Sequence, residues 1–200
     1  MNKIVKDAFV LTAITLISGL TLGTVYEVTK EPIAKQEELA KQEAFKTVLS
    51  DAESFEEKEL EGNRGVEIPA AAGYSAQQIT GVADALDGSG NVIGYVYTVV
   101  TSEGYAGDIS FTMGILSDGT VTGIEMLSIS ETAGLGMKAA EDEFKNQYAG
   151  KKVDKFEYTK SGAADENQID AISGATITTN AVTNGVNAGI EYFKAMQGGN

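Results

Sequence analysis

The run from Ala8 to Tyr26 contains no charged residue, and it limits what the chain can fold into more than any other stretch. An uncharged, mostly apolar segment of about 20 residues is long enough to span the hydrocarbon layer of a bilayer as a helix. In lipid, a helix satisfies its backbone hydrogen bonds internally. The sequence therefore predicts a membrane helix over residues 8–28, preceded by a short N-terminal stretch, residues 1–7.

A cleaved signal peptide is the alternative interpretation of this run. Signal peptides have shorter apolar regions that end in a small-residue cleavage site, and no convincing A-x-A site follows here. We therefore favour a retained single-pass anchor in the cell (inner) membrane. Lys3 and Lys6 precede the run, whereas Glu27 and Glu31 follow it. Because positive charges stay on the cytoplasmic side, this pattern predicts a cytoplasmic N-terminus and places the rest of the chain outside.

The stretch over residues 29–75 is expected to connect the membrane helix to a domain. Pro32 is expected to end the membrane helix, because proline lacks the N–H that a helix interior needs. Apolar residues recur at helical spacing over residues 35–49, which predicts an amphipathic helix. Residues 51–73 are acidic and show little periodicity, so they are predicted to be irregular surface.

The remaining residues, 76–200, are predicted to form one α+β domain with an antiparallel sheet and flanking helices. Strands are expected from about residue 78 and over residues 91–101, 108–115 and 121–127, with Asp118-Gly119 as a hairpin turn. A helix is expected from Met137 to Tyr148, and short strands over 153–158 and 168–172. A last helix is expected to bury the residues that recur at helical spacing, namely Val182, Val186, Ile190 and Phe193.

The turn from Ser173 to Thr176 stands directly before this last helix. The first turn of a helix has free backbone N–H groups and the positive end of the helix dipole. A phosphate can accept those N–H groups, and the small residues Gly174 and Ala175 allow it to approach closely. The alternative is that Ser and Thr here are ordinary N-cap residues. The sequence alone leaves both interpretations open.

The absence of cysteine and histidine excludes much chemistry. This chain alone cannot build Cys-ligated iron–sulfur clusters, structural zinc sites, Cys nucleophiles or Ser-His-Asp triads. The formal net charge of −14 argues against binding of nucleic acid. We expect no metal site, and any redox work would need an organic cofactor.

The segment from Asp170 to Thr176 resembles the flavinylation motif of the FMN-binding domain family. The motif reads Asp, two variable residues, Ser or Thr, Gly, Ala and Thr, and the match is complete: Asp170, Ala171, Ile172, Ser173, Gly174, Ala175 and Thr176. The resemblance implies that a flavin transferase joins the phosphate of FMN to the Thr176 hydroxyl. Thr178 and Thr179 are nearby hydroxyls that fall after the motif. Asp170 would either present the loop to the transferase or cap the turn through an Asx hydrogen bond.

Two further segments resemble parts of this family that lie beside the flavin. The first matches the family's Glu-Thr-Pro-Gly-Leu-Gly loop at Glu131, Thr132, Gly134, Leu135, Gly136 and Lys138. It has Ala133 in place of the Pro and Ile129 in place of a His. The second segment is Gly104-Tyr105-Ala106-Gly107, for which a simple turn is the alternative. A cation at Lys138 would favour a reduced, anionic flavin, and the carboxylate of Glu131 would oppose it.

Within the family, the chain resembles the G subunits of the membrane-bound Rnf complexes. The resemblance implies an electron relay through FMN in a ferredoxin:NAD⁺ oxidoreductase that translocates Na⁺ or H⁺, with no catalysis by this polypeptide alone. The implied partners are the other Rnf subunits (A, B, C, D and E), the flavin transferase and membrane lipid. Alternatives are a flavoprotein of another extracytoplasmic electron-transfer system, similar to the C subunit of the Na⁺-pumping NADH:quinone oxidoreductase, and a colourless binding or scaffold domain. A hydrolase fits least, because no nucleophile has a His base.

Overall fold

The computed structural model describes residues 3–198 and divides the chain into two compact units, Met1–Ala40 and Lys41–Asn200. Helix α1, Lys3–Val48, begins in the first unit and ends in the second. It is the one helix of the described residues that is long and apolar enough to cross a membrane. The hydroxyls of Thr12, Thr21 and Thr24 each donate to the carbonyl four residues earlier, so these polar groups are satisfied inside the helix.

Pro32 lies inside α1 and does not end it, which corrects the prediction that the helix stops there. A proline in a helix removes one hydrogen bond, but the turns on either side can stay helical when their own bonds remain. The amphipathic helix predicted over residues 35–49 is therefore the continuation of α1. Its end, which includes Phe45 and Val48, is buried, whereas Leu39 is exposed.

The second unit is built on an antiparallel five-stranded sheet with the strand order β1-β2-β3-β4-β5. The strands are β1 Ser54–Lys58, β2 Gln77–Leu86, β3 Val92–Thr101, β4 Ile109–Leu116 and β5 Val121–Ser128. The predicted strands 91–101, 108–115 and 121–127 are confirmed as β3, β4 and β5. The predicted Asp118-Gly119 turn joins β4 to β5, and Gly119 has φ +92°, which glycine adopts without strain.

The prediction of irregular surface over residues 51–73 is wrong, because this segment contains β1 and helix α2, Arg64–Ala71. Strand β1 has the sequence SFEEK, which lacks a strong strand pattern. It is a strand because residues 54–58 pair with residues 82–86 of β2. Helix α2 packs against β2 and against the last helix, α4. Both elements therefore depend on partners that are distant in the sequence.

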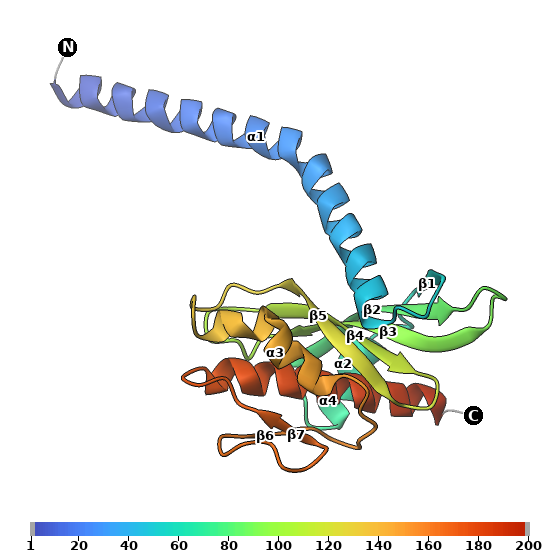
Figure 1. Cartoon of the computed structure of the whole chain (residues 1–200). Helices are drawn as coiled ribbons and strands as arrows, with labels where there is room; N and C mark the ends of the chain where they lie inside the picture. Colours follow the sequence, from blue (N-terminus) through green and yellow to red (C-terminus); the bar gives the residue numbers. More distant parts are fainter. Residues whose placement is uncertain (1–2, 199–200) are drawn as a thin grey trace. The chain divides into compact units, whose positions relative to one another are not determined.

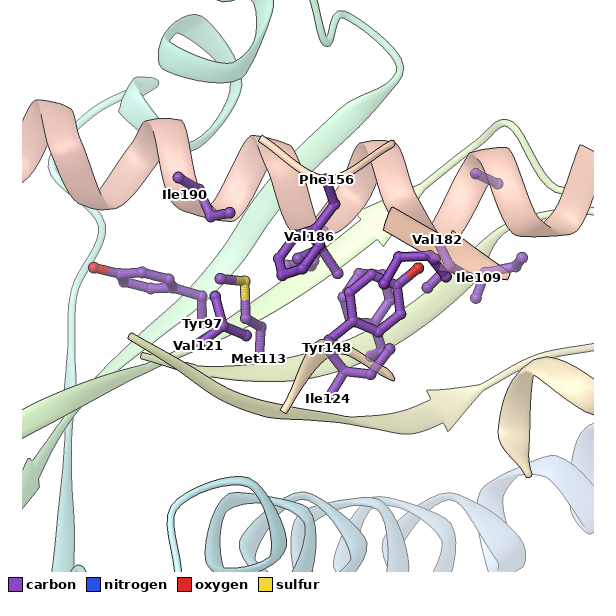
Figure 2. Close-up of a cluster of buried hydrophobic side chains, with 14 of the residues drawn as sticks. Tyr97, Ile109, Met113, Val121, Ile124, Tyr148, Phe156, Val182, Val186 and Ile190 are labelled. Carbon is purple, nitrogen blue, oxygen red and sulfur yellow. The ribbon is translucent and has the colours of Figure 1, made fainter. Parts of the chain in front are cut away.

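Helix α4, Thr176–Gln197, confirms the predicted last helix and runs across one face of the sheet (Figure 1). Figure 2 shows Val182, Val186 and Ile190 of α4 directed toward side chains such as Tyr97 and Met113. This cluster of buried side chains is the main core of the unit. It fixes the helix, and with it the turn that precedes the helix, against the sheet.

Buried polar contacts also hold α4 in place. The hydroxyls of Tyr148 and Thr183 share a hydrogen bond of 2.9 Å, and burial raises the pKa of Tyr148, so that its phenol stays neutral. The Asn187 side chain accepts from the backbone N–H of Phe156 at 2.8 Å and donates to its carbonyl at 2.9 Å. These hydrogen bonds connect α4 to Tyr148 and to Phe156.

Two predicted elements in this region are shorter than expected. The helix predicted from Met137 to Tyr148 is three pieces, η1 Gly136–Ala140, α3 Asp142–Lys145 and η2 Asn146–Tyr148. Glu141 has extended backbone angles and separates η1 from α3. The strand predicted over 153–158 is limited to β6, Glu157–Thr159, which pairs in parallel with β7, Gln168–Asp170. The backbone of Phe156 is bonded to Asn187 of α4 and not to a strand.

The other face of the sheet is covered by the end of α1. Phe45, Val48 and Leu49 form a second buried cluster with Val96 and its neighbours. Val96 and Tyr97 are adjacent in β3 and belong to different clusters, as expected for side chains on opposite faces of a strand. The Thr122 hydroxyl donates to the Val48 carbonyl at the end of α1.

We expect Gly114→Ala to destabilise this junction. An ideal Cβ at Gly114 would lie 2.6 Å from the Val48 carbonyl oxygen and would also collide with the Thr122 hydroxyl. Because backbone cannot move aside easily, the expected loss of unfolding free energy is about 1–3 kcal/mol, measured by thermal or denaturant unfolding. Gly88→Ala is the control, since its Cβ would meet only the end of the exposed Glu53 side chain. Equal stability of the two variants would contradict the expectation.

Candidate functional site

A pocket of about 540 Å³ opens at the N-terminal end of α4. Its lining comes from three segments that are far apart in the sequence. They are the loop between β3 and β4, the loop after β5, and the start of α4, and they contribute Tyr105, Glu131, Thr132, Leu135, Gly136 and residues 174–178. The fold thus brings together all three segments that the sequence motifs indicated.

The start of α4 has no side-chain cap. The N-cap residue is Ala175, which contradicts the alternative interpretation of an ordinary Ser or Thr N-cap. The backbone N–H of Ala175 donates to the Ile172 carbonyl. In the described part of the chain, the N–H groups of Thr176, Ile177 and Thr178 have no protein acceptor. Because these groups carry the positive end of the helix dipole, the pocket offers an anion site at its α4 side.

The three threonines of this first turn have different environments. Thr179 is buried, and its hydroxyl donates to the Ala175 carbonyl while accepting from the N–H of Ile172. Thr178 is buried, and its hydroxyl donates to the Glu131 carboxylate at 2.9 Å. Thr176 is half-buried, and within residues 3–198 its hydroxyl makes no hydrogen bond. Of the three hydroxyls, only that of Thr176 is free to react.

Glu131 connects the three segments of the pocket. Its side chain is buried, with 8% exposed, and one oxygen accepts from the Thr178 hydroxyl. The other oxygen accepts from the backbone N–H of Ala106 at 3.1 Å. Glu131 therefore joins the loop that it belongs to with the loop of Tyr105 and with α4.

Apolar side chains line the rim of the pocket. Tyr105 is 70% exposed, Ile177 is 53% exposed and Leu135 is 42% exposed. Large exposed apolar side chains around a cavity are typical of a ligand site, because the ligand covers them when it binds. The combination of an anion site and an apolar rim suits a ligand that has an anionic group and an apolar part.

Five of the predicted site residues do not line the larger pocket, and one of them, Thr179, is buried in α4. Lys138, Asp170 and Ser173 line a second pocket of about 230 Å³, together with Glu141 and other residues. Lys138 is exposed and does not contribute to the lining of the larger pocket. The structure therefore does not bring this cation to the place where the ring was expected. Gly134 lies in neither lining; its φ of +76° instead shapes the loop after β5.

Asp170 does not cap the turn of the motif as an Asx residue, which was one of its two predicted roles. Its carboxylate accepts from the N–H of Ala163, seven residues earlier, at 2.5 Å. Its backbone N–H donates to the Gln147 side chain at 2.6 Å. Asp170 therefore stabilises the loop that precedes β7, and its side chain makes no hydrogen bond to the turn over residues 171–176 among the described contacts.

Sequence reasoning missed Ile177, and it named the segment that contains Ala106 without giving Ala106 a role of its own. Ile177 belongs to the pocket lining, and its signal was an apolar side chain outside the buried stripe of α4. Ala106 contributes a backbone N–H, which any residue except proline would supply. No pattern of side chains could have identified it.

Comparisons with known proteins give two family matches. The FMN-binding domain matches residues 104–191, which include every segment of the larger pocket. The RnfG N-terminal region matches residues 1–48, which include α1.

Curated relatives match the chain over nearly its whole length. The G subunit of the Na⁺-translocating ferredoxin:NAD⁺ oxidoreductase complex of Acetobacterium woodii is 33% identical, over 92% of this chain and 84% of the relative. The G subunit of the proton-translocating complex of Clostridium ljungdahlii is 30% identical, over 94% and 91%. Among solved structures, NqrC of Shewanella oneidensis is 22% identical with a TM-score of 0.50, over 59% of this chain and 61% of that one, and it shares the fold of that part.

Proposed function

Because the chain belongs to the family of G subunits of ion-translocating ferredoxin:NAD⁺ oxidoreductase (Rnf) complexes, we propose that it is the flavin-carrying electron-transfer component of such a complex. The match to the RnfG N-terminal region favours this assignment over the C subunit of the Na⁺-pumping NADH:quinone oxidoreductase. The partners would then be the other membrane and peripheral subunits of the complex, A to E. Relatives of both the proton and the sodium type are similar, so the family does not select the coupling ion.

We propose further that FMN is joined covalently through its phosphate to the Thr176 hydroxyl. One observation carries this proposal: Thr176 places a hydroxyl that has no hydrogen-bond partner among residues 3–198 in the same pocket as the free N–H groups of the α4 start. The resulting phosphodiester keeps one negative charge, which those N–H groups can accept. A flavin transferase would make the bond during maturation, and Asp170, Ser173 and Lys138 on the adjacent pocket are available to it.

When bound, FMN supplies the redox chemistry, since this chain has no cysteine to form a redox disulfide or to hold an iron–sulfur cluster. The protein would hold the phosphate at the N–H groups of residues 176–178. Tyr105, Leu135 and Ile177 would pack against the apolar ring and exclude water from part of it. The open rim leaves a side from which an electron can enter or leave.

We place the chain in the membrane through α1, with a cytoplasmic N-terminus and the FMN domain on the extracytoplasmic side. Lys3 and Lys6 before the uncharged run, and Glu27 and Glu31 after it, support this orientation. Co-purification with further membrane subunits would support the Rnf assignment. Purification without them would favour another extracytoplasmic electron-transfer system.

The test of the flavin proposal is the purified chain on a denaturing gel and in an intact-mass measurement. We expect in-gel flavin fluorescence and a mass increase equal to FMN less one water. Protein made in cells without the transferase is the control and is expected to be dark and unmodified. A dark band at the unmodified mass, from cells that flavinylate other proteins, would contradict the proposal and leave a colourless binding domain as the better interpretation.

A further inference from the structure

Glu131 hydrogen-bonds through its side chain to both of the other segments that line the larger pocket. One carboxylate oxygen accepts from the Ala106 N–H at 3.1 Å, and the other from the Thr178 hydroxyl at 2.9 Å. We call these two hydrogen bonds the Glu131 clasp. We propose that Glu131 is a positioning residue that assembles the pocket through the reach of its side chain, and not through its negative charge beside the ring. The flavin as ligand rests on the function proposed above.

Two glycines allow the loops around the clasp to pack closely. An ideal Cβ on Gly104 would lie 2.9 Å from the carboxylate oxygen that accepts from Ala106. An ideal Cβ on Gly136 would lie 2.7 Å from the other carboxylate oxygen and 2.6 Å from the Thr178 hydroxyl. The absence of side chains at both positions lets the two loops and α4 approach one another around the carboxylate. This close packing therefore holds the Glu131 side chain in one conformation.

The Glu131 carboxylate is buried and has no ion-pair partner among the described residues. Among the described residues, no Lys or Arg forms an ion pair with Glu131. Burial of a carboxylate is unfavourable unless hydrogen bonds compensate for the lost hydration. A carboxylate offers acceptors at both ends, and these match the N–H and the O–H that face it. The two donors therefore account for a carboxylate at this position without any role of its charge toward a ligand.

The clasp fixes the distance between the rim and the attachment residue. Ala106 directly follows Tyr105, whose exposed ring lies on the rim. Thr178 lies two residues after Thr176 in the same helical turn. Because Glu131 holds Ala106 and Thr178, it sets how far Tyr105 stands from Thr176. Loss of the clasp should leave a ligand attached but poorly ordered.

Three variants of Glu131 separate the effect of side-chain length from the effect of charge. Glu131→Gln keeps the length of the side chain; its amide can accept from the Ala106 N–H and donate to the Thr178 hydroxyl oxygen. Glu131→Asp keeps the charge but is one methylene shorter, so it cannot reach both partners. Glu131→Ala has neither property. Unfolding curves of all three establish that the domain is folded.

The first readout is hydrogen–deuterium exchange of residues 104–107, which does not depend on flavin. We expect exchange about tenfold faster in the Asp and Ala variants and parent-like exchange in the Gln variant. The second readout is the visible circular dichroism of the attached flavin. Its signal per attached flavin should be lost in the Asp and Ala variants and kept in the Gln variant.

The opposite order, with Asp like the parent and Gln impaired, would overturn the proposal in favour of a role of the charge. Parent-like behaviour of the Ala variant, or impairment of both Gln and Asp, would also overturn it. If the Glu131 variants do not fold, Thr178→Val decides, since it keeps the shape and removes one donor; unchanged exchange there would count against the clasp. Absence of the mass label in the parent would refute the flavin proposal alone, because the exchange measurement would still test the clasp.

Discussion

Thr176→Ala is expected to abolish covalent attachment of FMN. The variant should lose both the in-gel fluorescence and the added mass, a complete loss where the parent is fully labelled. The physical reason is that the reaction needs a hydroxyl that is accessible and not already hydrogen-bonded. Thr176 alone meets this condition among the three threonines of the first turn, since Thr178 is held by Glu131 and Thr179 by the backbone.

The matched control for this variant is Thr178→Val. It removes a neighbouring hydroxyl from the same pocket and leaves Thr176 in place, so the mass label should remain. Peptide mapping of the parent should place the modification on the peptide that contains Thr176. A label that persists in Thr176→Ala, mapped to Thr178, Thr179 or Ser173, would show that the acceptor was assigned wrongly.

Phe111→Ala is expected to cause the largest loss of stability of the substitutions considered. Phe111 of β4 is fully buried in the main core. It lies directly under α4, where an ideal Cβ on Gly185 would be 2.8 Å from its ring. Removal of the ring loses buried apolar surface and leaves a cavity at the contact between helix and sheet. The expected loss of unfolding free energy is about 3–5 kcal/mol.

Denaturant unfolding measures this change, and thermal unfolding should show a midpoint lower by roughly 2–4 °C for each kcal/mol. Tyr158→Ala is the control, because this aromatic ring is 37% exposed and lies outside the core. Its effect should stay within about 0.5 kcal/mol. A Phe111→Ala variant as stable as the control would mean that α4 is not held by this contact, and the positioning of the pocket would then need another explanation.

Some residues of the site could be predicted from sequence motifs, and others could not. The motif over residues 170–176 and the loop over residues 131–136 are contiguous, so their resemblance to a flavin-binding family could be read directly. Lys138 was placed beside the flavin by the same reasoning, yet the fold directs it to the smaller pocket. A residue close to a binding loop in the sequence can still direct its side chain away from the ligand site, and the sequence did not indicate which side it takes.

The sequence by itself determined those features that depend on the pattern of residues within one helix or strand. The uncharged run over residues 8–26 specified a membrane-length helix, strand propensity specified β3, alternation specified β4, and helical spacing specified α4. These signals lie within one element, and the hydrophobic effect acts on them wherever the element finally packs. The absence of Cys and His likewise limited the chemistry without any knowledge of the fold.

Only the tertiary structure decided which groups meet. Strand β1 exists because β2 pairs with it, and the Phe156 backbone leaves the expected strand because Asn187 binds it. Among the threonines of α4, a contact with Glu131, 47 positions earlier, removes Thr178 from the available hydroxyls and leaves Thr176 free. Such choices depend on contacts between distant residues, whose partners no local pattern specifies, and so they are fixed only when the whole domain packs.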